Sequence, residues 1–278
     1  MSTWFVTGTS RGIGLELVRR LLERGDNVAA TTRSIPRLTD ALGSGSGDRL
    51  LPLALDLTDE AAVAAAVSQA EDRFGGIDVV VNNAGYGFLG AVEETSATEV
   101  RRMFEVQVFG AWNVLRAVLP GMRVARRGHI INVSSVLGLT AFPGWALYCS
   151  AKYALEGISD ALAGEVAGFG IKVNVIEPGY TRTDFLRPPA LGLPEGHVAG
   201  YEDIRAMTEA HLAMPGTQLG DPAKVAAAII EVAASGRAPL HQLLGSDSYA
   251  IAQDRIKALA EDFEASRDLA ATTDITSA

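Results

Sequence analysis

Three polar residues, Ser135, Tyr148 and Lys152, carry side chains suited to proton transfer. Tyr148 and Lys152 are four residues apart, so a helix would place the phenol and the ammonium group on one face. A free tyrosine keeps its proton until about pH 10, and a nearby positive charge lowers that pKa. Lys152 could therefore make Tyr148 an acid–base group at neutral pH, although ordinary packing on a helix surface gives the same spacing.

Ser135 strengthens this interpretation because of its position. It ends an apolar run over residues 129–135 that is typical of a buried parallel strand. Ligands of open α/β sheets bind at the carboxyl ends of the strands. We therefore expect the Ser135 hydroxyl to face a bound ligand.

A glycine-rich turn follows the first predicted strand and opens the first predicted helix. Residues 7–14 have the spacing Gly-x-x-x-Gly-x-Gly, a variant of the dinucleotide-binding fingerprint. Backbone amides and the helix dipole can hold a pyrophosphate there, and glycines let the backbone approach it closely. Such a turn can also be a plain connection between a strand and a helix. The predicted cofactor-binding residues in the turn are Gly8, Thr9, Ser10, Arg11, Gly12, Ile13 and Gly14.

Residues after the third and fourth predicted strands support a dinucleotide site. Asp56 and Leu57 follow the third strand, and Asn83, Ala84 and Gly85 follow the fourth. We expect them at the same sheet edge as the glycine turn, because the carboxyl ends of parallel strands share one edge. Their positions suit an adenine and its ribose.

The end of the second predicted strand bears on the choice of cofactor. An acidic residue about 20 positions beyond the glycines would bind the ribose 2′-hydroxyl of NAD, whereas an arginine accommodates the 2′-phosphate of NADP. The strand ends at Arg33 without an acid, and Arg11 lies inside the turn. The sequence predicts NADP(H) over NAD(H), the alternative being that both arginines are merely solvated.

Apolar runs alternate with amphipathic segments of helical length, as expected for βαβ units around a parallel sheet. We predict an α/β fold with a doubly wound parallel sheet. The predicted strands are residues 4–7, 27–32, 50–55, 78–82, 128–134, 171–177 and 240–244. The predicted helices are residues 13–24, 59–74, 97–123, 147–168, 203–212, 222–235 and 248–265.

The whole chain, residues 1–278, is predicted to form one domain. Glycines and prolines interrupt the pattern over residues 184–220, which we interpret as an irregular lid over the substrate. Residues 43–47 predict a flexible surface loop. Residues 266–278 predict a frayed tail.

Composition argues against several classes of protein. The chain has 48% hydrophobic residues, 21% charged residues and a net charge of −9, and it lacks the basic run that a nucleic-acid surface needs. No stretch has the ~18 apolar residues of a membrane helix, and no secretory signal is recognisable. The single cysteine, Cys149, excludes an internal disulfide, which favours a cytoplasmic location. The four histidines lack metal-ligand spacing, so we expect no metal site.

Four motifs in order resemble the short-chain dehydrogenase/reductase family over residues 3–244. They are residues 7–14, residues 82–85, Ser135 with Tyr148 and Lys152, and residues 178–183. The resemblance implies a Rossmann-type sheet of seven strands in the order 3-2-1-4-5-6-7. It also implies hydride transfer between a nicotinamide and a carbonyl or alcohol carbon.

The resemblance further implies roles for individual residues. Tyr148 would be the general acid in reduction and the base in oxidation, while Lys152 would lower its pKa and hold the nicotinamide ribose. Ser135 would position and polarise the substrate oxygen. The residues placed where family members contact the nicotinamide and the phosphates are Pro178, Gly179, Thr181 and Thr183.

One residue departs from the family pattern. The family has an asparagine in the long fourth helix, where it bends the helix and holds a water that links the lysine to solvent; this chain has Gln107. Glutamine carries the same amide on a side chain one methylene longer. The proton relay is therefore expected either to persist with shifted geometry or to be lost.

The predicted substrate end is apolar. Residues 148–157 are similar to the branch of the family with 17β-hydroxysteroid and retinol dehydrogenases, which implies an apolar substrate that could be cyclic or polycyclic. Core packing is an equally good interpretation of each aromatic residue. The candidate pocket residues are Tyr86, Phe88, Val136, Leu137, Phe142, Trp145, Phe185 and Leu186.

Three functions are compatible with these residues. The first is an NADP(H)-dependent oxidoreductase that acts on an apolar carbonyl or alcohol, with the reductive direction favoured. The second is a sensor or scaffold that binds NADP(H) and has chemistry impaired through Gln107. The third is an isomerase or dehydratase that uses Tyr148 without net redox change.

The resemblance also bears on assembly. Helices 97–123 and 147–168 form a four-helix interface in the family, which implies a homodimer or homotetramer. The helix at 248–265 could restrict assembly to a dimer.

Overall fold

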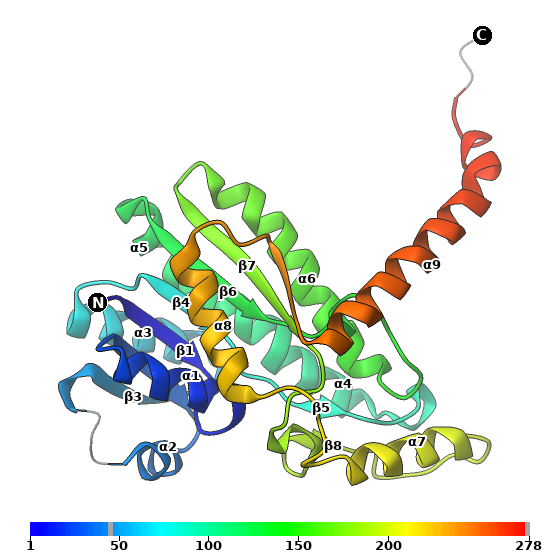
Figure 1. Ribbon diagram of the computed structural model, residues 1–278, viewed down its shortest axis with the longest axis horizontal. Helices are drawn as coiled ribbons and strands as arrows, with labels where there is room; N and C mark the ends of the chain where they lie inside the picture. Colours follow the sequence, from blue (N-terminus) through cyan, green and yellow to red (C-terminus); the bar gives the residue numbers. More distant parts are fainter. Residues whose placement is uncertain (44–46, 276–278) are drawn as a thin grey trace.

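A parallel seven-stranded sheet forms the centre of the molecule (Figure 1), which a computed structural model describes over residues 1–43 and 47–275. The order across the sheet is β3-β2-β1-β4-β6-β7-β9. This order confirms the predicted 3-2-1-4-5-6-7, because β6, β7 and β9 are the fifth, sixth and seventh predicted strands. The sheet strands are β1 (Thr3–Thr7), β2 (Asn27–Thr32), β3 (Leu50–Ala54), β4 (Val79–Asn82), β6 (Gly128–Val133), β7 (Ile171–Pro178) and β9 (His241–Leu244).

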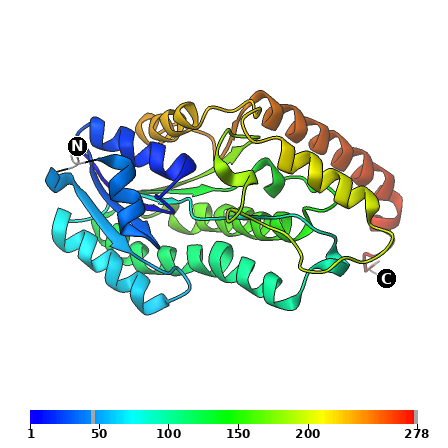
Figure 2. The same cartoon turned by 90° about the horizontal axis from the view of Figure 1, so that it is seen from below.

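Helices cover both faces of the sheet, as the two views show (Figures 1 and 2). Alternate residues of β1 point to opposite faces: Trp4 and Val6 pack with α1 and α8, whereas Phe5 packs with α3, α5 and α6. Burial on both faces explains why a central strand such as β1 is almost continuously apolar. The helices are α1 (Gly12–Glu23), α2 (Ile35–Leu42), α3 (Glu60–Phe74), α4 (Ala97–Phe104), α5 (Gly110–Ala125), α6 (Ala146–Ala167), α7 (Glu202–Ala213), α8 (Pro222–Ser235) and α9 (Ser246–Ala271).

The structure differs from the sequence prediction at two helical segments: α2 and the predicted helix over residues 97–123. Helix α2 was not predicted; it starts at Ser34, whose hydroxyl accepts a hydrogen bond from the Arg37 amide, and has proline in its first turn. The predicted single helix over 97–123 is instead α4, a π-helical turn over Glu105–Phe109, and α5. A π turn inserts an extra residue and commonly lies at a functional site.

The lid, residues 184–220, is anchored on the body of the protein. Its short strand β8 (Leu191–Gly192) pairs with β5 (Gly87–Phe88), which follows β4. The buried Glu94 carboxylate accepts hydrogen bonds from the Val198 amide at 3.0 Å and from the Arg205 guanidinium at 3.1 Å. The lid therefore has a defined position beside the carboxyl edge of the sheet.

Helix α9 projects away from the sheet (Figure 1) and continues through Ala271. The predicted frayed tail from residue 266 is therefore wrong over residues 266–271, because alanine and leucine favour helix there and Glu264 pairs with Arg267 across one turn. Residues 276–278 of that tail, and 44–46 of the predicted loop, lie outside the described residues. Over residues 1–43 and 47–275, no helix combines the length and apolar character needed to cross a bilayer.

Candidate active site

A cavity of about 1590 Å³ runs along the carboxyl edge of the sheet, between the glycine turn and the lid. Such edges are where open α/β sheets bind ligands. The cavity brings together most of the residues predicted from the sequence. Those that line it are Gly8, Ser10, Arg11, Gly12, Ile13, Arg33, Asp56, Leu57, Asn83, Gly85, Tyr86, Ser135, Val136, Leu137, Phe142, Trp145, Tyr148, Lys152, Pro178, Gly179, Thr181, Thr183, Phe185 and Leu186.

The glycine turn is built against β4. Gly8 has φ +71°, and a Cβ there would lie 2.7 Å from the Ala84 Cα atom. A Cβ on Gly14 would collide with the Gly8 carbonyl oxygen and the Asn83 amide. The Asn83 side chain donates hydrogen bonds to the carbonyls of Thr7 and Gly8, at 2.9 and 3.1 Å. Glycine is thus required for close packing that leaves the start of α1 facing the cavity, where its amides can bind an anion.

Two predicted turn residues and one neighbour support the cavity from behind. Thr9 is buried, and its hydroxyl donates to the Thr31 carbonyl at 3.0 Å. Gly14 and Ala84 lie behind the lining at the contacts with Gly8. Thr9, Gly14 and Ala84 therefore position the turn and do not line the cavity.

Three arginines gather where β2 and α2 meet the glycine turn. Burial, followed by the positive charges of Arg37 and Arg33, lowers the pKa of Arg11. In the described part of the chain none of these three guanidinium groups forms an ion pair with a carboxylate, and Asp184, which faces Arg11, pairs with Arg187 at 3.7 Å. Repelling cations without a partner suit a phosphate.

Arg37 was missed by sequence reasoning because α2 was not predicted. The signal was present: Ser34 is a favourable N-cap, and Pro36 suits a first turn.

Asp56 lies near Arg33 at the same end of the cavity. Two hydrogen bonds from Thr58 lower the pKa of the Asp56 carboxyl, and they do so more than the positive charge of Arg33 does.

The three polar residues of the proton-transfer prediction meet at the middle of the cavity. Ser135 is the second residue after the end of β6, whereas Tyr148 and Lys152 lie on consecutive turns of α6. The Lys152 ammonium donates to the Val133 carbonyl at 3.1 Å and lies 5.5 Å from the centre of the Tyr148 ring. The predicted i, i+4 geometry is therefore present in the structure.

Burial has the largest effect on the pKa values of Tyr148 and Lys152. It raises the pKa of Tyr148 well above that of a free phenol, and a hydrogen bond with Ser135 only partly opposes the rise. Burial lowers the pKa of Lys152 to about 8, and the charge of Glu156 opposes that fall. At pH 7 the phenol is protonated and the ammonium form of Lys152 predominates.

Two aromatic rings contact the buried ring of Tyr148. Trp145 and Phe185 each contact its ring edge-on, with centroids 5.6 Å apart. Phe88 does not line the cavity, because its ring packs in the core against Gly192 and Gly90. Sequence reasoning also missed apolar lining residues of the lid, whose irregular sequence gave no periodic signal: Pro189, Ala190, Leu191, Ile204 and Met207.

A polar pair also lines the substrate end. The Tyr180 hydroxyl lies 2.8 Å from Nε2 of His211, and Nδ1 of His211 lies 2.8 Å from the Met207 carbonyl. The carbonyl can only accept, so Nδ1 carries the proton and Nε2 accepts from Tyr180. Neither Tyr180 nor His211 was predicted, because their contact joins the segment after β7 to helix α7.

Comparison with known proteins agrees with this site. The family model for short chain dehydrogenases matches residues 2–190. The chain belongs to the short-chain dehydrogenase/reductase family. It is 38% identical over 270 residues to "Oxidoreductase BOA17" of Botryotinia fuckeliana, covering 96% of this chain and 97% of that protein.

Solved structures of short-chain dehydrogenases share the fold. A short-chain dehydrogenase from Streptomyces avermitilis matches with a TM-score of 0.91 and 35% identity, covering 99% of both chains. ElxO with NADP bound matches with a TM-score of 0.73 and 28% identity, covering 87% of this chain and 96% of that one. The protein is therefore an oxidoreductase of the short-chain family, whose members bind a nicotinamide cofactor.

Gln107, where this short-chain dehydrogenase departs from the family asparagine, is buried in the π turn. Its amide NH₂ donates to the Tyr86 carbonyl at 2.8 Å and contacts the Met103 sulfur. Its carbonyl oxygen has no hydrogen-bond partner within the described residues. That oxygen lies near Gly85, since a Cβ on Gly85 would be 2.8 Å from it and 3.7 Å from the Lys152 nitrogen.

A small cavity of about 10 Å³ separates Gln107 from Lys152. A volume of that size is near the lower limit for one water molecule, and a buried water needs several polar partners. Gln107 and Lys152 both border it, and the Gln107 carbonyl oxygen and the Lys152 nitrogen both lie close to Gly85. The side chain that replaces asparagine therefore still points an acceptor toward the lysine.

Proposed function

We propose that the protein is an NADPH-dependent reductase that delivers a hydride and a proton to the carbonyl group of an apolar, ring-containing ketone. The observation that carries the proposal is the buried Tyr148 phenol, which faces the cavity between Ser135 and Lys152. The glycine turn lies at one end of that cavity, and aromatic side chains lie at the other. One site can thus hold both reactants.

The residues at the cofactor end fit a dinucleotide with an extra phosphate. Gly8 and Gly14 stand where any Cβ would collide, so the backbone of the turn packs closely beneath the cavity. Arg11, Arg33 and Arg37 supply positive charge that carboxylates within the described residues leave unpaired. These three arginines would hold a 2′-phosphate, and the first amides of α1 would hold the pyrophosphate. Bound NADPH supplies the hydride.

Tyr148 supplies the proton. As the carbonyl carbon gains the hydride, its oxygen takes the proton from the Tyr148 hydroxyl, and the product is an alcohol. The Lys152 ammonium stabilises the phenolate that this transfer leaves. Ser135 donates a hydrogen bond to the substrate oxygen and fixes its distance from the phenol. The Gln107 carbonyl would accept a hydrogen bond from one water in the small cavity, and that water would return the proton toward Lys152.

The first test is an assay of the purified protein with NADPH and a graded panel of ketones. We expect NADPH consumption with cyclohexanone-type and fused-ring ketones, and a kcat/KM that rises with apolar ring area, because Trp145, Phe185 and Leu191 line the substrate end. A phosphorylated ketose serves as the control and should be a poor substrate. NADPH that remains unchanged while a product forms would favour the isomerase or dehydratase, and no reaction would favour the sensor.

Gln107→Asn distinguishes a working relay from an impaired one. We expect kcat to fall by about threefold to tenfold, because the shorter side chain loses its hydrogen bond to the Tyr86 carbonyl, worth about 1 kcal/mol. Gln107→Leu removes the amide at similar size and should lower kcat further and change its pH profile. A tenfold gain in kcat for Gln107→Asn, measured in the ketone assay, would instead support impaired chemistry in the natural chain.

Assembly into a homodimer or homotetramer is proposed through α5 and α6. Phe109 and Trp112 are each 50% exposed, and Tyr153 on α6 is also exposed. Large apolar side chains exposed together are typical of an interface. Sedimentation of the purified protein measures the state, and a monomer would contradict the proposal.

A further inference from the structure

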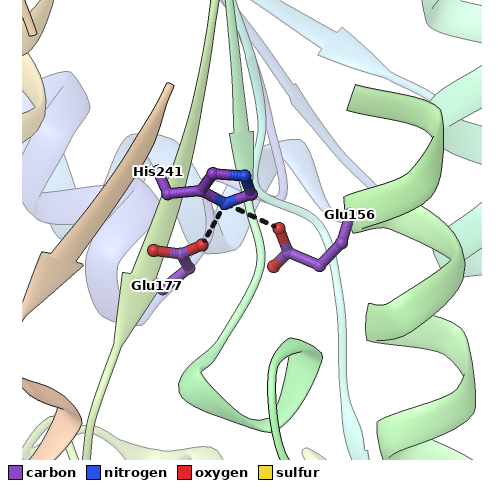
Figure 3. A group of neighbouring side chains, drawn as sticks. All are labelled: Glu156, Glu177 and His241. Carbon is purple, nitrogen blue, oxygen red and sulfur yellow. Dashed lines mark hydrogen bonds and ion pairs between the residues drawn. The ribbon is translucent and has the colours of Figure 1, made fainter. Parts of the chain in front are cut away.

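A cluster of titratable side chains lies one helical turn beyond Lys152, outside the cavity described above. Glu156 comes from α6, Glu177 from β7 and His241 from the start of β9 (Figure 3). None of the three lines the cavity. They are widely separated in sequence, and only the adjacent positions of α6, β7 and β9 bring them together.

The ligand atoms of the cluster converge on one point. Figure 3 shows Nδ1 of His241 facing both carboxylates, at 2.8 Å from a Glu177 oxygen and 3.5 Å from a Glu156 oxygen. One ligand atom from each residue lies within 4.8 Å of the other two. Ligands that surround one Zn²⁺ ion at about 2.1 Å are about 3–3.5 Å apart, so small shifts would complete a site.

The two carboxylates are buried without enough partners. Glu177 is fully buried and Glu156 is 6% exposed. Within the described residues the second oxygen of Glu177 lacks a hydrogen-bond partner, and the Ser134 hydroxyl is the neutral donor beside Glu156. A buried carboxylate without a partner is costly. The ammonium of Lys152, one turn before Glu156 on α6, donates to the Val133 carbonyl at the active site.

The other nitrogen of His241 is already oriented. Nε2 lies 3.0 Å from a carboxylate oxygen of Asp160, one turn beyond Glu156 on α6. When Nε2–H donates to Asp160, the lone pair of Nδ1 faces Glu156 and Glu177. Carboxylates orient metal-binding histidines in this way. The His241 side chain is 41% exposed, which gives an ion access from solvent.

We propose that Glu156, Glu177 and His241 bind one divalent transition-metal ion of the Zn²⁺ type, with Asp160 orienting His241. One imidazole nitrogen with two carboxylate oxygens suits Zn²⁺, Mn²⁺ or Co²⁺ better than Ca²⁺ or Mg²⁺, which take oxygen ligands. The ion would link α6 to β7 and β9. Its role is structural, because its ligands lie outside the cavity.

The test uses full-length protein treated with a chelator and then titrated with Zn²⁺ by calorimetry. We expect one Zn²⁺ per chain and a rise in Tm of roughly 5 °C at about 100-fold excess over Kd, because the ion binds only the folded state. Co²⁺ should give the absorption spectrum of nitrogen and oxygen ligation. Mg²⁺ should do neither.

Variants decide whether these residues are the ligands. His241→Gln and Glu156→Gln should each weaken Zn²⁺ binding by at least about tenfold. His197→Gln is the matched control, because His197 lies on the lid near Glu94, away from the cluster. This variant should bind Zn²⁺ as tightly as the natural protein does. No stoichiometric Zn²⁺, or an equal Tm rise in His241→Gln and the natural chain, would overturn the proposal and leave a proton between the carboxylates. Each outcome is independent of reductase activity.

Discussion

Tyr148→Phe is expected to lower kcat by roughly 10²–10⁴-fold while the Kd for NADPH changes by less than about threefold. The substitution removes only the hydroxyl that we propose gives its proton to the substrate. The ring remains and keeps its edge contacts with Trp145 and Phe185. Ser135 keeps its hydrogen bond from the Leu137 amide at 3.1 Å, so the end of β6 stays in place.

Two measurements separate chemistry from binding in this variant. NADPH affinity is measured by fluorescence titration, and kcat with the best ketone of the panel under saturation. Tyr249→Phe is the control, because Tyr249 is exposed on α9 and does not line the cavity. We expect it to keep the natural kcat. A Tyr148→Phe variant within threefold of the natural kcat would exclude Tyr148 as the acid.

The parts of this site that the sequence predicted well depend on short stretches of chain. The central strands β4 and β6 are buried on both faces, so their apolar runs are nearly continuous, and a polar residue stands at the carboxyl end of β4 and directly after that of β6. Tyr148 and Lys152 share a helix face, which their spacing alone determines. The seven-strand order followed from the family resemblance and is confirmed by the structure.

The parts that were missed depend on contacts between distant segments. Arg37 reaches the cavity from a helix of eight residues; its N-cap and proline are visible in the sequence, but its position beside the glycine turn is not. The π turn around Gln107 is stabilised by the Tyr86 carbonyl, and His211 meets Tyr180 across the lid. His241 has no nearby ligand in sequence, yet parallel pairing of β7 with β9 places it beside Glu177. Such contacts require the register of the fold, which local patterns do not contain.

Arg33→Ala combined with Arg37→Ala is expected to weaken NADPH binding by at least about 10²-fold and NADH binding by less than about threefold. A hydrogen bond to a charged group is worth about 1.5–3 kcal/mol, so losing two to one phosphate gives an effect of this size. NADH has no 2′-phosphate, so its Kd should change little with either substitution. The ratio of the two Kd values, measured by fluorescence titration, is therefore the sensitive quantity.

The mutual repulsion of the three arginines gives a second, independent expectation for the same double variant. Arg33 and Arg37 both lower the pKa of Arg11 because they repel its positive charge. Removing them relieves that repulsion, so the free protein should be as stable as the natural chain or more stable, even though it binds NADPH poorly. Arg116→Ala is the control, since Arg116 pairs with Glu60 on the surface at 2.9 Å and should change neither affinity nor Tm. A natural chain that prefers NADH, or a double variant that loses both cofactors equally, would show that the arginines do not select NADPH.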